Sequence, residues 1–137
     1  MVTFKMRAPD LEGEFHLFGG AANVRKFSGY RPQHEVHKNY QTSGNHVYIG
    51  REFIDPGETV QVQVELITPE VYPHCLWVGR ELMVLEGAKH VGTLRVTNVL
   101  NALLQVAPDA YKAVWVEPDS LCDVQLSMIK SREGISV

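Results

Sequence analysis

The sequence predicts an all-β protein, either a β-sandwich or a closed antiparallel β-barrel. The strongest observation is the segment 59–67, TVQVQVELI, in which apolar and polar residues alternate without a break. Such alternation places the apolar side chains on one face of a strand. The second observation is that about six short segments of strand character lie between residues 12 and 100, separated by turn residues at regular spacing.

The N-terminal part contains two of these segments. Residues 1–10 show no pattern and are expected to form an arm. Residues 12–18, EGEFHLF, alternate and predict a first strand that ends at Gly19-Gly20. Pro32 has no N–H to donate to a ladder and therefore marks a strand start or edge. The mostly polar residues 33–38, QHEVHK, are predicted to follow as a strand.

The centre of the chain is divided by two expected turns. Residues 42–45, TSGN, are a cluster of turn formers, and we expect a strand from 46 to 53 after them. Residues 55–58, DPGE, predict a type II turn because proline fixes φ at its first central position and glycine tolerates a positive φ at the second. The alternating segment 59–67 follows directly.

Two more strands are predicted before residue 101. A long loop with two prolines occupies 68–74 and is followed by strands at 80–85 and 90–100. Residues 86–89, EGAK, join these strands, and Gly87 suits a tight hairpin turn. No internal repeat or low-complexity segment interrupts the series.

The C-terminal residues 102–137 differ from the rest. A short helix is expected at 101–106 and an extended segment at 111–116. Residues 122–128 alternate and favour a strand, although a helix beginning near Ser120 also fits the apolar spacing. We therefore expect an extension to the β-domain in this part of the chain.

Composition limits the function classes. A chain of 137 residues fits one domain, and its net charge of −3 argues against a general phosphate-binding surface. Cys75 and Cys122 are too few for a disulfide framework and are expected to be idle thiols. No apolar run is long enough to span a bilayer, and no secretory signal is recognisable, so a cytoplasmic location is expected.

Catalytic and metal-binding motifs are not found. The phosphate-binding pattern GxxxxGK[ST] is missing, which excludes GTP hydrolysis and makes the DxxG match at 10–13 a chance one. His34 and His37 are one residue short of an HExxH spacing and would face opposite sides of a strand. The histidines are therefore expected at the surface or rim, with no metal or cofactor. No nucleophile–base arrangement can be assembled, so we expect no enzyme activity.

Four motifs in order carry a resemblance to a known family. They are GYRPQ at 29–33, TSG at 42–44, DPGETVQVQVELITP at 55–69 and EGAKHVG at 86–92. Together they resemble the third domain, the C-terminal barrel, of elongation factor Tu, over about residues 11–101. The resemblance implies a six-stranded antiparallel closed β-barrel. In that family the domain packs on the GTPase domain, contacts the exchange factor and helps hold the T-stem of aminoacyl-tRNA.

The resemblance also implies where a partner would bind. Taken alone, Arg31 and Gln33 fit a structural corner as well as a contact site. The candidate RNA- or partner-binding residues carried over from the family are Arg31, Gln33, Ser43 (or Thr42), Glu86, Gly87 and Lys89. The chain departs from the family at Leu85, where an arginine that could meet a phosphate is replaced.

Two functions are compatible with these observations. The first is a non-catalytic module that contacts tRNA or a translation factor through the barrel rim. The second is a protein-interaction or regulatory module, with an immunity-type role as one subcase, that mimics the factor's barrel without binding RNA. A barrel without its neighbouring domains would expose their former contact surface. We therefore expect residues 102–137, with Trp115 and the strand 122–128, or self-association, to cover it.

Overall fold

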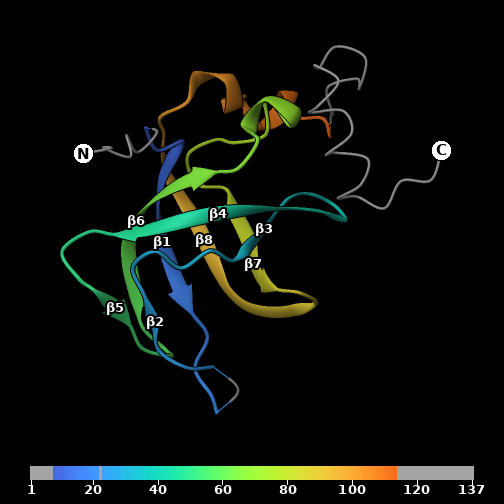
Figure 1. Cartoon of the computed structure of the whole chain (residues 1–137). Helices are drawn as coiled ribbons and strands as arrows, with labels where there is room; N and C mark the ends of the chain where they lie inside the picture. The colour runs from blue at the N-terminus through green and yellow to red at the C-terminus, as the bar shows by residue number, and fades with distance from the viewer. Residues whose placement is uncertain (1–7, 22, 114–137) are drawn as a thin grey trace, which may run out of the picture.

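A closed β-barrel forms the body of the protein. The computed structural model describes residues 8–21 and 23–113 (Figure 1). Six strands close into an antiparallel barrel in the order β1-β6-β4-β3-β7-β8. The prediction of an all-β, six-stranded antiparallel closed barrel is confirmed. The strands are β1 (Leu11–Leu17), β3 (Gln33–His37), β4 (Tyr40–Tyr48), β6 (Thr59–Leu66), β7 (Glu81–Glu86) and β8 (Lys89–Val99).

Alternation along the strands separates the barrel interior from its outer wall. In β6 every second residue is buried, as its sequence predicts, while the residues between them face outward. In β1 the same alternation holds over all of Leu11–Leu17. The largest side chains that fill the interior of the two strands are Leu11, Phe15, Leu17, Val60, Val62, Val64 and Leu66.

The expected turn at 42–45 is wrong, because these residues lie inside the continuous strand β4. Short polar and glycine residues are needed there because Thr42 and Gly44 face the crowded interior. The chain instead reverses two residues after β3, where Asn39 adopts a positive φ of 63° that asparagine tolerates. The expected strand 46–53 is also wrong, since β4 ends at Tyr48.

A small ribbon stands at one end of the barrel. It pairs β2 (Lys26–Phe27) with β5 (Phe53–Ile54) in antiparallel fashion. Figure 1 shows the ribbon below the barrel, at the end opposite the 3₁₀ turns. The residue that follows β5, Asp55, opens the predicted turn, in which Glu58 N–H donates to the Asp55 carbonyl at 3.1 Å and Gly57 has a φ of 91°.

The other end of the barrel is covered by three 3₁₀ turns, η1 (Pro69–Val71), η2 (Ala102–Leu104) and η3 (Pro108–Ala110). Leu76 forms a parallel bridge with Gln105, so the loop before β7 and the chain after β8 run side by side. Leu104 is completely buried in the core. The first part of the expected extension therefore belongs to the packed barrel.

Several expectations lie outside the described residues. They are residues 1–7 of the arm, Trp115 and the strand 122–128. Asp10, at the end of the expected arm, is buried, and its Oδ2 accepts a hydrogen bond from Leu66 N–H at 2.7 Å. No helical segment within the described chain is long and apolar enough to cross a bilayer.

Candidate functional site

The segment from Phe27 to Gln33 runs alongside β4, in antiparallel direction, and continues into β3. Tyr30 N–H donates to the Phe27 carbonyl at 3.1 Å, and Gly29 supplies the positive φ of 99° that closes this turn. Two backbone hydrogen bonds with His46 then attach the segment to β4, one from Gly29 N–H at 2.7 Å and one to the Tyr30 carbonyl at 2.8 Å. Arg31 follows as an exposed residue on the outer wall.

Glu86, a predicted contact residue, is held by two partners of its own chain. The Tyr30 hydroxyl donates to Glu86 Oε2, and Lys26 Nζ lies 2.7 Å from the same oxygen. Hydrogen bonds from Lys26 and then Tyr30 hold the pKa of the Glu86 carboxyl below its usual value. This side chain therefore joins the end of β7 to the segment before β3, which is a structural task.

The predicted hairpin at Gly87 and Lys89 is present. Glu86 and Lys89 are paired residues of β7 and β8, and Gly87 in the loop between them has a φ of 62°. Both Gly87 and Lys89 are exposed. The hairpin thus brings three predicted residues together by local geometry.

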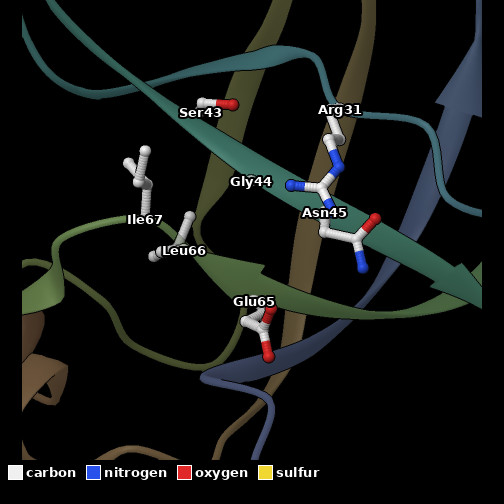
Figure 2. A pocket seen from close by; sticks show the side chains of 7 residues that line it. All are labelled: Arg31, Ser43, Gly44, Asn45, Glu65, Leu66 and Ile67. Atoms are coloured by element: carbon white, nitrogen blue, oxygen red, sulfur yellow. The ribbon is translucent and has the colours of Figure 1, made fainter. Parts of the chain in front are cut away.

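Arg31, Gln33 and Ser43 lie on the outer wall at neighbouring positions. Gln33 is paired with Ser43 of β4 on one side and with Leu85 of β7 on the other. Arg31 and Ser43 border an open hollow of about 180 Å³. Figure 2 shows this hollow; its lining residues are Arg31, Ser43, Gly44, Asn45, Glu65, Leu66 and Ile67.

Asn45 and Glu65 are lining residues that sequence reasoning missed. They are direct register partners on β4 and β6. Asn45 Oδ1 and Glu65 Oε2 are both buried, and neither accepts a hydrogen bond within residues 8–21 and 23–113. The outward position of Glu65 in its alternating strand was the available signal, but the wrong turn at 42–45 hid its partner Asn45.

Two histidines form a buried pair inside the barrel. The Nε2 atoms of His34 and His46 are 2.7 Å apart, and His34 Nδ1 lies 3.2 Å from the Thr42 carbonyl oxygen. Because a carbonyl only accepts, His34 carries its proton on Nδ1, and His46 Nε2–H therefore donates to His34 Nε2. Burial lowers the pKa of His34 to about 4, and burial followed by the His34 charge lowers that of His46 as well.

The expectation of surface or rim histidines is wrong for His34, His37 and His46, which are completely buried. Each interacts with another ring: His37 Nδ1, for example, lies 2.6 Å from the Tyr111 hydroxyl. Among the residues that the structure describes, no group of three or more His, Cys, Asp or Glu side chains could hold a metal ion. Burial also raises the pKa of the Cys75 thiol to about 12, which leaves it a poor nucleophile.

Four large apolar residues on or near the β2–β5 ribbon are together called the ribbon platform. Phe27 and Phe53 belong to the ribbon, Val24 precedes β2 and Ile49 precedes β5; Phe53 is partly exposed and the other three are exposed. Val24 and Phe27 are 64% and 60% exposed. The Phe27 and Phe53 rings pack edge to face with centroids 6.0 Å apart. The exposed Phe27 ring is thus held against the partly exposed Phe53 ring.

Two arginines frame this platform with their charges already paired. The Arg25 guanidinium lies 3.8 Å above the Phe53 ring and bonds Asp55 at 2.7 Å. Arg51 bonds Glu58, also at 2.7 Å. The hydrogen bond from Arg25 holds the pKa of the Asp55 carboxyl below its ordinary value. The pKa of the Glu58 carboxyl is lowered first by the hydrogen bond from the Asp55 backbone N–H and second by the one from Arg51.

A scan of the chain against models of known protein families finds no match. The described surface has two features to which a partner could bind. One is the hollow beside Arg31, and the other is the ribbon platform that ends at Phe27. The segment Phe27 to Gln33 connects them.

Proposed function

We propose that this protein is a non-catalytic docking module that resembles the third barrel of elongation factor Tu and binds a protein of the translation machinery. The observation that carries the proposal is the ribbon platform. Exposed aromatic side chains with flanking arginines are the composition of protein interface centres. Phe27 supplies the aromatic ring, and Arg25 and Arg51 supply the guanidinium groups.

The charges of the platform favour a protein over RNA as the partner. Binding to a phosphate backbone needs cations that can replace counterions. Arg25 and Arg51 already share Asp55 and Glu58, and Lys26 is paired with Glu86. The net charge of −3 adds no general attraction for a polyanion.

Two features of the described chain support a non-catalytic role. The buried His34 and His46 bind each other, and His37 bonds the Tyr111 hydroxyl, so none of the three faces solvent. The Cys75 thiol is buried and its pKa is raised to about 12. These groups are unsuited to general base or nucleophilic work near neutral pH.

The test is direct binding to purified elongation factor Tu, its exchange factor and aminoacyl-tRNA by interferometry. We expect one of the two proteins to bind, and the variant Phe27→Ser to weaken that binding by at least about tenfold. Val78→Ser is the matched control, because Val78 is 63% exposed but lies in the loop before β7. The ribbon platform would not be the docking surface if both variants bound equally well or if the wild type bound neither protein.

Contact with tRNA is the second candidate, and the exposed Arg31 beside Gln33 and Ser43 is the observation that favours it. In that case tRNA would bind with an affinity that falls steeply with salt. The variant Arg31→Gln would weaken binding, whereas Phe27→Ser would not. The two variants therefore distinguish the candidates.

A further inference from the structure

We propose that the hollow beside Arg31 is a binding site for a free α-amino acid with a short aliphatic side chain. This site goes beyond the docking function and does not depend on it. The residues that line the hollow offer three kinds of chemistry, and each suits one of the three groups on the α-carbon of such a ligand.

The first side accepts hydrogen bonds. Asn45 Oδ1 and Glu65 Oε2 are neighbours across β4 and β6, and neither has a donor among the described residues. Asn45 is only 7% exposed, so its acceptor cannot be satisfied fully by bulk water. A buried acceptor without a donor is destabilising, so a ligand that supplies the donor is favoured. An ammonium group has three N–H donors and a charge that complements the Glu65 carboxylate.

The second side donates hydrogen bonds. Figure 2 shows the Arg31 side chain projecting at the edge of the hollow, with the Ser43 hydroxyl on the same side of the pocket. None of the ion pairs found in the described chain involves Arg31. Its guanidinium is therefore available to a carboxylate, which it binds in fork geometry.

The third group is apolar and is supplied by Ile67, which borders the hollow and is 56% exposed. The side chain of its neighbour Leu66 faces the barrel interior. A volume of about 180 Å³ holds about six water molecules of about 30 Å³ each. This space suits an amino acid of the size of alanine or valine.

Charge excludes the simpler occupants. A phosphate or carboxylate alone would be repelled by Glu65, and a guanidinium or ammonium alone would be repelled by Arg31. Only a ligand with both charges close together complements the two side chains at once. The zwitterionic backbone of a free amino acid has this arrangement.

The experiment is a titration of the ¹⁵N-labelled full chain with L-valine, followed by NMR. We expect saturable shifts at residues 31, 43–45 and 65–67, with a dissociation constant of about 1 mM, which is ordinary for so small a ligand. Isobutylamine and isovalerate, each carrying one of the two charges, are expected to bind at least about tenfold more weakly.

Two variants test the charged sides. Arg31→Gln and Glu65→Gln should each weaken valine binding by about 10–100-fold, because each removes a charged hydrogen bond. Glu52→Gln is the matched control, since Glu52 is an exposed carboxylate outside the hollow. Isovalerate binding as tightly as valine, unchanged binding in Glu65→Gln, or no saturable shift in the folded wild type would each overturn the proposal.

Discussion

His46 Nε2–H donates a hydrogen bond to His34 Nε2 across 2.7 Å in the interior of the barrel. The Phe15 ring meets the His46 ring edge to face with 4.8 Å between centroids, and the Tyr30 ring does so at 5.8 Å. His46 Nδ1 is buried and has no partner among the described residues. Burial lowers the pKa of both rings and so favours their neutral forms, and the hydrogen bonds select one tautomer for each.

The tautomers of this pair are the first prediction. His34 should be protonated on Nδ1 and His46 on Nε2, because only this arrangement satisfies the Thr42 carbonyl and the contact between the rings. Long-range ¹H–¹⁵N NMR at pH 7 distinguishes the two forms by their nitrogen shifts. A charged ring at pH 6, or the opposite tautomer at His34, would contradict the assignment.

The pH dependence of stability follows from the same pair. Both folded pKa values lie below the ordinary value of 6.5, that of His34 at about 4, so the pair's contribution is complete above pH 6.5 and is lost as pH falls. The unfolded chain then binds two more protons, and the free energy of unfolding should fall by up to about 2.7 kcal/mol per pH unit. Urea titrations at pH 7, 6 and 5 measure this fall.

Carboxylates do not obscure that measurement. The pKa values of Asp55, Glu58 and Glu86 are lowered from ordinary values of 3.8 and 4.5, so their contribution is lost only at more acidic pH. An unfolding free energy that stays constant between pH 7 and 5 would show that the histidines are not held neutral.

Gly44 is predicted to be irreplaceable by alanine. A Cβ at this position would meet His34 Cε1 at 2.9 Å and Val64 Cγ1 at 3.0 Å. Overpacking of this kind costs about 1–3 kcal/mol. Gly19→Ala is the control, because its nearest neighbour would be 3.8 Å away. Thermal unfolding measures the stability of both variants. If Gly44→Ala were as stable as Gly19→Ala, the space beside His34 would not be as crowded as the structure indicates.

Removal of the hydroxyl group should have different effects on stability at Tyr30 and at Tyr48. Tyr30→Phe deletes the hydrogen bond to Glu86 and should cost about 1.5–3 kcal/mol, the value for a charged acceptor, or less because Glu86 is partly exposed. The Tyr48 hydroxyl is buried without a partner in the described chain, so Tyr48→Phe should be neutral or stabilising. Urea unfolding measures both, and the reverse order of stabilities would contradict this account.

The alternating strands could be predicted because their pattern follows directly from burial on one face. Residues 59–67 show this best, and the hairpin at Gly87 was equally clear because the turn needs a residue that tolerates positive φ. Residues 42–45 could not be predicted, since small polar residues usually form turns. Here small residues are needed within a strand to leave room for His34, which is a requirement of tertiary packing that the local sequence does not reveal.

The candidate site was predictable only in part. Arg31, Gln33 and Ser43 do lie at neighbouring positions, but Glu86 is bound to Tyr30 and Lys26. These partners are 56 and 60 positions away in the chain, and no local pattern announces such contacts. The pairing of Asn45 with Glu65 depends likewise on the register between β4 and β6.

The chain after β8 is predicted to stabilise the barrel through Leu104. This side chain is completely buried, and its carbonyl accepts hydrogen bonds from Cys75 and Leu76 N–H groups at 2.8 Å. Leu104→Ala should therefore cost about 2–5 kcal/mol, whereas Leu103→Ala, at a residue 41% exposed, should change stability by about 0.5 kcal/mol or less. Urea unfolding measures both, and Leu103→Ala serves as the control because it removes the same atoms from the adjacent position. If Leu104→Ala cost no more stability than Leu103→Ala, the buried Leu104 side chain would not stabilise the barrel. The turn η2 would then not be part of the core.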